Sequence, residues 1–285
     1  MNSLASSVLA LVGVAARRAP GLPEGEHIPR IEVERRVVVE AGWLRSYRVA
    51  VGAVDDGCLP PCAAQALAIG LHLQILSDRK FPLPALGIVH IDNRIDELRA
   101  LKLPAPAPLL LTVRAFAQGE RRSERGIEFD ITTEVHDEQG LAWRSVLSAL
   151  VLAKKRDAPD RKKREPEPTT TTTTSSVVRV PADMGRRFCR IAGDANPIHL
   201  TALTAKAFGF PRAIAHGMWT LGRALAEVDD LLPPRPRRID ARFIRPVFLP
   251  GSIVIDGTRE GSTTLLRVHP ERGGAPHLIG RISAL

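Results

Sequence analysis

The second half of this chain repeats sequence features of the first half in the same order. This internal repeat is the feature that most limits the folds that the chain can adopt. Tyr47 and Gly52 have counterparts, an aromatic residue and a glycine, 141 residues later. Residues 91–95 (IDNRI) recur as residues 239–243 (IDARF), 148 residues later. Similarity over so long a period indicates two copies of one structural unit. The offset grows by seven between these points, so the second copy carries an insertion.

Hydrophobic spacing predicts a long helix and about five strands in each copy. Residues 63–76 are apolar nearly all round, so this helix must be buried on most sides. The economical packing is α+β, with an antiparallel sheet wrapped around the helix in each half and the two sheets joined edge to edge. The predicted strands are 31–39, 88–97, 108–117, 126–136, 141–153, 177–180, 237–246, 252–258, 263–268 and 276–283, and the predicted helices are 41–51, 63–76, 181–191, 201–208 and 216–228.

A segment rich in Lys, Arg, Pro and Thr separates the two halves. Residues 154–176 offer almost nothing to bury, which is typical of a flexible linker. The expected division is residues 1–153 for a first repeat with an N-terminal arm, 154–176 for the linker and 177–285 for the second repeat. Part of the net charge of +9 lies in this linker. A nucleic-acid-binding tail is the sharper alternative, but the segment lacks interleaved aromatic residues, so no nucleic-acid partner is expected.

Hydropathy and cysteine content indicate a cytoplasmic protein. No apolar run in the sequence reaches the roughly 20 residues that span a bilayer, so no membrane span is expected. Residues 3–16 faintly resemble a signal-peptide core, but no Lys or Arg precedes them, and we expect a short helix instead. Cys58, Cys62 and Cys189 are an odd number without metal-ligand spacing, so small buried thiols are expected.

Residues 188–218 hold the most specific pattern for chemistry. The run GDANPIH places Asp194 and His199 five residues apart, and the run AHGM at 215–218 opens a predicted helix. An acid, a base and a helix N-terminus are the groups needed to move a proton next to a carbonyl. The first half has AVDD at 53–56 in place of the acid–base run. We therefore expect one site per chain, with the first half as its floor.

These residues carry a resemblance to a known family. Phe188, the run GDANPIH and the run IAHGM are similar to the hydratase-2 motif and the second landmark of the MaoC-like dehydratases, also called (R)-specific enoyl-thioester hydratases. The degenerate first half resembles the double-hotdog members, including the mycobacterial type of 3-hydroxyacyl-thioester dehydratase. Two departures are Ala192, where the family usually has Ser, Thr, Gly or Cys, and Leu225, where some members place a hydroxyl.

The resemblance implies a double hotdog, with two antiparallel sheets each wrapped around a central helix. It implies reversible dehydration and hydration between (R)-3-hydroxyacyl and trans-2-enoyl thioesters of CoA or acyl carrier protein in fatty acid metabolism, without a cofactor or a metal. Asp194 and His199 would be the acid and the base, and the Gly217 N–H would hold the carbonyl oxygen as charge develops. The expected substrate-binding residues are Asn196, His216 and Met218.

Other interpretations remain open at this point. Ala192 and Leu225 permit a non-catalytic protein that binds acyl thioesters, and the basic charge permits a nucleic-acid-associated protein. A metal held by Asp194, His199 and His216 is conceivable, although the spacing offers no standard ligand cluster. Strand edges left after the two sheets pair also allow a homodimer.

Overall fold

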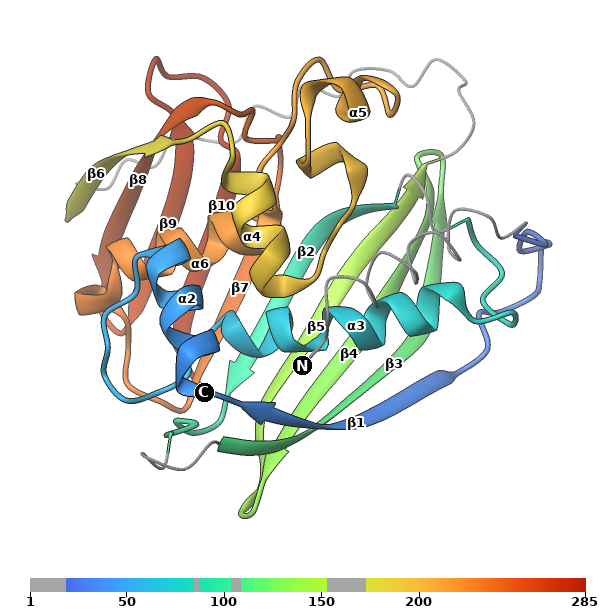
Figure 1. Cartoon of the computed structure of the whole chain (residues 1–285), viewed down its shortest axis with the longest axis horizontal. Coiled ribbons are helices and arrows are strands. Elements are labelled where there is room, and N and C mark those ends of the chain that lie inside the picture. The colour runs from blue at the N-terminus through green and yellow to red at the C-terminus, as the bar shows by residue number, and fades with distance from the viewer. Residues whose placement is uncertain (1–18, 85–87, 104–108, 153–172) are drawn as a thin grey trace.

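One antiparallel sheet of ten strands runs through the whole molecule (Figure 1). The computed structural model describes residues 19–84, 88–103, 109–152 and 173–285. The strands are β1 (Ile31–Val39), β2 (Ile88–Glu97), β3 (Leu109–Ser123), β4 (Gly126–Asp137), β5 (Gly140–Leu152), β6 (Thr174–Val180), β7 (Arg237–Phe243), β8 (Gly251–Glu260), β9 (Thr263–Pro270) and β10 (Leu278–Ala284). The helices are α2 (Ala41–Val51), α3 (Ala63–Ser77), α4 (Met184–Ala192), α5 (Ala202–Lys206) and α6 (Gly217–Glu227), with short 3-10 turns η1 (Pro197–His199) and η2 (Asp229–Leu231).

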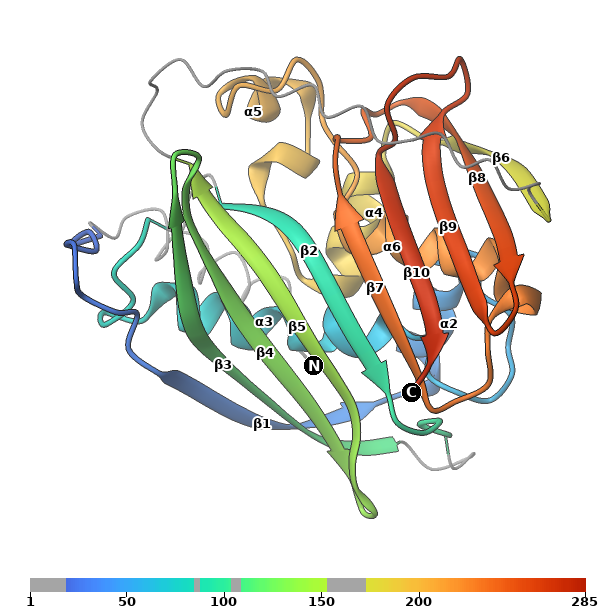
Figure 2. The same cartoon turned by 180° about the vertical axis from the view of Figure 1, so that it is seen from behind.

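The strand order repeats the sequence pattern. From one edge to the other it is β1-β3-β4-β5-β2-β7-β10-β9-β8-β6. Read inward from either edge, the two halves therefore have the same order, with β2 and β7 meeting as the seam between them. The sheets join edge to edge as the sequence predicts, and the arrangement is the double hotdog implied by the resemblance (Figure 2).

Four ion pairs cross the seam between β2 and β7, and two of them are related by the repeat. Arg94 Nε lies 2.8 Å from Asp240 Oδ1, and Arg242 Nε lies 2.8 Å from Asp92 Oδ1. Asp92 and Arg94 are the repeat equivalents of Asp240 and Arg242. The strand sequence is thus self-complementary, because each copy supplies the charges that the other copy needs.

The helices lie together on one face of the sheet, as Figures 1 and 2 show from opposite sides. Helix α3 packs on β1, β3 and β4, and most of its residues are buried, as its apolar sequence predicts. Indole N–H groups tie the helices of the two halves together. Trp43 Nε1 donates to the carbonyl of Ile191 at 3.0 Å, and Trp219 Nε1 donates to that of Ala50 at 2.8 Å.

Several strand boundaries differ from the sequence-based expectation. Those that differ by three residues or more are the start of β6, the end of β3 and the end of β7, which stops at Phe243 and not at residue 246. β6 begins at Thr174, inside the predicted linker, because residues 174–176 continue the ladder with β8 opposite Gly257 to Ile255. β3 runs on to Ser123 through a register shift after Gln118, since its charged end pairs with β4. The rest of the linker, residues 154–172, and the segment at 3–16 lie outside the described residues. The division into two repeats and a linker stays a prediction.

Two further expectations concern exposure. The three cysteines are buried and free, as predicted. Within the described residues, no helix combines the length and the apolar character needed to cross a membrane.

Candidate active site

A left-handed glycine turns the chain from α4 into the candidate site. Gly193 has φ 77°, and its N–H donates to the Cys189 carbonyl at 2.8 Å. Gly52 ends α2 in the same way, with φ 72°. Glycine occupies this backbone region without the steric cost that a Cβ would impose. The repeated glycine therefore ends a helix in both halves, and in the second half Asp194 follows immediately.

Local hydrogen bonds fix the turn that carries His199. The Asn196 side chain accepts from the Ile198 N–H at 3.4 Å and so caps η1. Thr204 Oγ1 donates to the Pro197 carbonyl at 2.7 Å. Asn196 contacts the loop backbone here, and its role in substrate binding stays a prediction. It thereby holds the segment between the acid and the base.

Helix α4 approaches this turn through Gly185. A Cβ built at Gly185 would lie 1.9 Å from the carbonyl oxygen of His199, which is far inside van der Waals contact. A residue larger than glycine would push the His199 backbone away from α4. Gly185 was not predicted as a site residue, because a glycine inside a predicted helix carries no signal of which distant backbone it faces.

His199 is buried and oriented by a backbone carbonyl. Its Nδ1 lies 2.8 Å from the Ile214 carbonyl oxygen, and the side chain belongs to a residue that is 7% exposed. A carbonyl oxygen can only accept, so Nδ1 carries the proton and Nε2 keeps a free lone pair. Burial, and then the neighbouring His216, lower the pKa of His199 below its usual value. The imidazole is therefore a neutral proton acceptor at physiological pH.

His216 contacts both His199 and Asp194. The two imidazole rings are stacked, with centroids 3.7 Å apart. His216 Nε2 is 3.1 Å from the Asp194 backbone carbonyl and 3.8 Å from Oδ2 of the same residue. Burial lowers the pKa of His216 as well. His216 thus braces both the acid and the base, in addition to preceding α6 as its N-cap.

Asp194, His199 and His216 form a cluster whose nitrogen and oxygen atoms lie within 4.8 Å of one another. One carboxylate and two imidazoles could hold a transition-metal ion, although sequence spacing had offered no standard ligand cluster. The same three groups suit proton transfer. Asp194 is the most exposed of them, with a side chain that is 28% accessible, and its Oδ1 accepts from the Asn196 N–H at 3.2 Å.

The first turn of α6 completes the candidate site. Gly217 is the first residue of this helix, where backbone N–H groups lack intrahelical partners and the helix dipole favours negative charge. A Cβ at Gly217 would lie 3.0 Å from the Phe243 ring, so glycine permits a close approach here. Met218 is buried next to it. These residues stand where a thioester carbonyl could be held.

The first half contributes two histidines near the Asp194 carboxylate. Burial lowers the pKa of His72 to about 4 and that of His90 to about 4, and the charge of Asp194 partly opposes both shifts. His72 Nε2 lies 2.8 Å from Thr133 Oγ1, so it is a core histidine with a partner. His90 packs on the Phe243 ring. Sequence reasoning did not single out His90, which enters the site through the pairing of β2 with β7.

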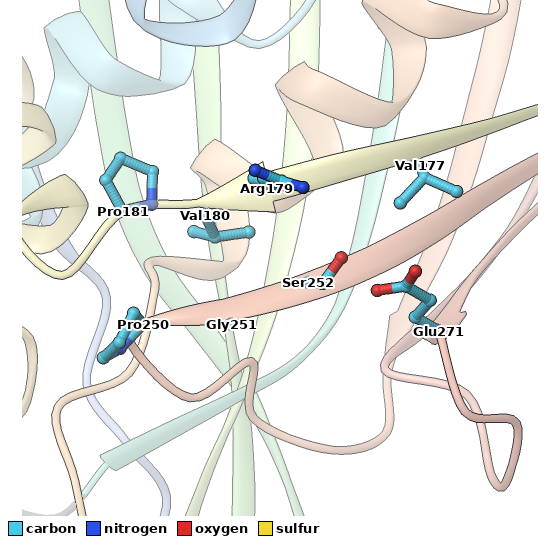
Figure 3. Close-up of a pocket in the computed structure, with 8 residues that line it drawn as sticks. All are labelled: Val177, Arg179, Val180, Pro181, Pro250, Gly251, Ser252 and Glu271. Atoms are coloured by element: carbon cyan, nitrogen blue, oxygen red, sulfur yellow. The ribbon is translucent and has the colours of Figure 1, made fainter.

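The two positions that depart from the family pattern are both buried. Ala192 is 5% exposed at the end of α4, and Leu225 is 2% exposed in α6. A separate pocket lies between β6 and β8, lined by Arg179, Ser252 and Glu271 among others (Figure 3). None of the predicted site residues lines that pocket. The candidate site is therefore the Asp194–His199–Gly217 region.

Comparison with known proteins relates the chain to hydratases and dehydratases. Residues 155–272 match the family described as MaoC like domain. The chain is 28% identical to 3-hydroxyacyl-thioester dehydratase X of Mycobacterium tuberculosis, over 96% of this chain and 97% of that protein. The crystal structure of HtdX from the same organism superimposes with a TM-score of 0.75 and 26% identity, covering 90% of this chain and 100% of that chain.

Two other similarities are more limited. A 70-residue stretch is 40% identical to the peroxisomal enoyl-CoA hydratase 2 of Arabidopsis thaliana, covering 23% of this chain and 22% of that protein. A Mycobacterium tuberculosis protein described as having a double hotdog fold superimposes with a TM-score of 0.56 and 13% identity, over 95% of this chain and 98% of that one. The second similarity bears on the fold alone.

Proposed function

Because the chain contains a MaoC-like domain within a double hotdog, we propose that this enzyme interconverts (R)-3-hydroxyacyl thioesters and trans-2-enoyl thioesters by removing or adding water. The observation that carries the proposal is the cluster of Asp194 with His199, whose Nδ1 pairs with the Ile214 carbonyl and so leaves Nε2 to act as a base. A neutral base can take a proton from C2 of the substrate, and a carboxyl group near it can protonate the hydroxyl that leaves C3.

Dehydration needs three events at the substrate. His199 Nε2 takes the C2 proton, and the electron pair of that C–H bond moves toward the thioester carbonyl. The Gly217 N–H donates to the carbonyl oxygen as negative charge develops there. The C3–O bond then breaks, and a protonated Asp194 supplies the proton with which the hydroxyl leaves as water.

Hydration runs through the same steps in reverse. Asp194 holds the water and takes one of its protons while the oxygen adds to C3, and the imidazolium of His199 returns a proton to C2. In a variant of this scheme, Asp194 and His199 both act on one water between them. Each proton transfer typically contributes roughly 10²–10⁴ in rate.

The carrier of the acyl group is CoA or an acyl carrier protein. CoA bears phosphates and carrier proteins are usually acidic, so the net charge of +9 suits both. We also propose a cytoplasmic setting within fatty acid metabolism. A homodimer remains a proposal, since β1 and β6 each end the sheet with one unpaired side among the described strands.

A second candidate function is binding of acyl thioesters without turnover. Ala192 and Leu225 permit it, because Ala192 stands where the family usually has Ser, Thr, Gly or Cys and Leu225 stands where some members place a hydroxyl. This reading predicts tight binding of acyl-CoA with no addition of water. The dehydratase reading predicts both binding and turnover.

The test follows the absorbance of the conjugated enoyl thioester during incubation with crotonyl-CoA and longer 2-enoyl-CoAs. Wild type is compared with His199→Ala and Asp194→Asn, which should abolish turnover while leaving the fold intact. His136→Ala and Asp229→Asn are matched controls, because they make the same chemical changes outside the site and should retain activity.

The outcomes distinguish the dehydratase from the non-catalytic binding protein. Full activity in both site variants would overturn the assignment of Asp194 and His199. A folded wild type that binds CoA esters but consumes none calls for the same assay with an enoyl-acyl carrier protein. Failure there as well would favour the non-catalytic binder.

A further inference from the structure

Asn93 is a buried polar side chain that reaches from the first half to the start of α6. It is 2% exposed and lies on β2, directly opposite Ala241 of β7 at the seam. Its Nδ2 donates to Met218 Sδ at 3.6 Å, which leaves Oδ1 as the other end of the amide. Met218 follows Gly217, whose N–H would hold the thioester carbonyl. Asn93 is therefore adjacent to the proposed reaction site, although it belongs to the half without the acid–base pair.

The amide of Asn93 cannot satisfy both its ends within the described residues. His90 Nε2 lies 3.1 Å from the Asp92 carbonyl, which can only accept, so this nitrogen carries a proton. It cannot also accept from Asn93 Nδ2, which is 3.3 Å away. Asn93 Oδ1 has no hydrogen-bond partner in the described structure.

Rotating the amide by half a turn does not remove the problem. Oδ1 would then accept from His90, but Nδ2 would take the position that has no partner. A buried amide group left unpaired costs about 1–3 kcal/mol, so such a group is usually matched by a ligand or a water. Asn93 thus keeps one unpaired amide end beside the end that contacts Met218.

We propose that Asn93 hydrogen-bonds to the pantetheine arm of the substrate, at the amide nearest the sulfur. This inference rests on the proposed function, since CoA and acyl carrier proteins both present their thioesters on that arm. The amide is two methylene groups from the thioester sulfur and offers both an N–H and a carbonyl. It can therefore pair with Asn93 in either orientation of the side chain.

The repeat gives this proposal a further argument. The equivalent of Asn93 in the second half is Ala241, at the offset of 148 that relates the two strands. The second half carries the acid, the base and the helix N-terminus. The first half has lost those groups and carries a polar side chain at the seam. In this proposal the second half carries out the reaction and the first half binds the carrier arm.

The experiment compares three crotonyl thioesters that differ only in the arm. Crotonyl-CoA carries the whole arm, crotonyl-N-acetylcysteamine keeps only the amide nearest the sulfur, and S-ethyl thiocrotonate has no amide. We expect Asn93→Ala to lower kcat/KM about 10-fold to 100-fold for the first two and to leave the third unchanged. Activity on S-ethyl thiocrotonate also shows that the variant is folded.

Arg94→Ala is the matched control, because it removes an exposed side chain from the next position of the same strand. Its effect should be the same for all three thioesters. An equal loss in Asn93→Ala on all three would overturn the proposal and place Asn93 at the reacting atoms or in the packing of Met218. No loss on any would mean that water pairs with the amide.

A separate measurement covers failure of the proposed function itself. If wild type consumes none of the thioesters, binding of S-butyl-CoA, a thioether that cannot react, is measured by calorimetry. Weaker binding in Asn93→Ala than in wild type would support the arm contact without any turnover. Equal affinity would overturn it.

Discussion

His199 and His216 stack their imidazole rings with centroids 3.7 Å apart and an interplanar angle of 26°. Two buried rings this close cannot both be charged without strong repulsion. Burial is the larger cause of the low pKa of His199, and His216 adds to it. The pair therefore holds the proposed base in its neutral form.

This relationship predicts the pH dependence of turnover. A lowered pKa means that His199 keeps its Nε2 lone pair as the pH falls through 6.5, the usual value for histidine. Because the base stays unprotonated, we expect kcat/KM for dehydration not to fall as the pH decreases to 6 and below. His216→Phe preserves ring stacking but removes the second titrating ring, which should raise the pKa of His199. The loss of kcat/KM on the acidic side of the pH profile should therefore begin at a higher pH. Steady-state rates from pH 4.5 to 8.5 check this, and an unshifted acid limb near 6.5 in both proteins would contradict it.

Stability should fall in acid because of histidines buried in the neutral form. Burial lowers the pKa of folded His72 to about 4, whereas an unfolded histidine titrates near 6.5. Between these values the unfolded chain binds the proton and the folded protein does not. The free energy of unfolding therefore decreases as the pH falls through this window, by up to about 1.4 kcal/mol per pH unit for each such group.

Urea titrations of wild type and His72→Asn at pH 7 and pH 5 measure this effect. The variant should lose less stability than wild type between the two values, whatever its stability at pH 7. Parallel losses would mean that His72 is protonated in the folded state.

Gly185→Ala should displace the base. The added Cβ would meet the His199 carbonyl oxygen at 1.9 Å, so the turn must move away from α4. A shift of about 1 Å near reacting groups can cost about 100-fold in rate, and we expect a loss of this order in kcat together with a lower Tm. Gly42→Ala is the control, since nothing lies within 4 Å of a Cβ at that helical position. It should keep activity and stabilise α2 by up to about 1 kcal/mol.

Two ion pairs near the seam should differ in their contributions. Arg94 and Asp240 are both largely exposed, with side chains 55% and 42% accessible, so Asp240→Ala should cost about 1 kcal/mol or less. Glu97 is buried between Arg235 and Arg237. Glu97→Ala leaves buried Arg237 without its carboxylate and should cost about 3–5 kcal/mol. Denaturant unfolding of both variants compares them, and equal costs would contradict this account.

A metal role for the cluster has a direct test. If Asp194, His199 and His216 act only by proton transfer, exhaustive dialysis against a chelator should leave kcat unchanged. Loss of activity that returns with one added divalent ion would assign the cluster to metal binding. Metal analysis of the purified protein gives an independent readout.

Much of the fold was predictable because its signals are local. The apolar helix at 63–76, the alternating strands and the repeated Gly52 and Gly193 follow from residue spacing and backbone freedom. The edge-to-edge sheet followed from the repeat. The start of β6 was placed too late, because a run of Thr and Ser indicates a linker unless its partner strand is known.

The candidate site was predictable only in part. The acid, the base and the start of the helix all lie within residues 188–218, so one sequence motif was enough to predict them. Asn93, His90 and Gly185 were missed, because each acquires its role through contact with a distant segment. Register between β2 and β7 places Asn93 opposite Ala241, and the packing of α6 brings Met218 to it, which no pattern within β2 itself specifies.

The self-complementary seam also bears on how the chain can be divided. β7 carries Asp240 and Arg242 on either side of Ala241. Two copies of this strand, paired antiparallel about Ala241, would each set an Asp against the other copy's Arg. A fragment beginning at residue 173 would therefore expose an edge suited to symmetric self-association. Such a fragment should form a two-site dimer, measurable by light scattering, in which Ala241 takes the place of Asn93 on both sides. The covalent joining of two unequal copies allows one copy to specialise, which a symmetric pair of identical chains cannot do.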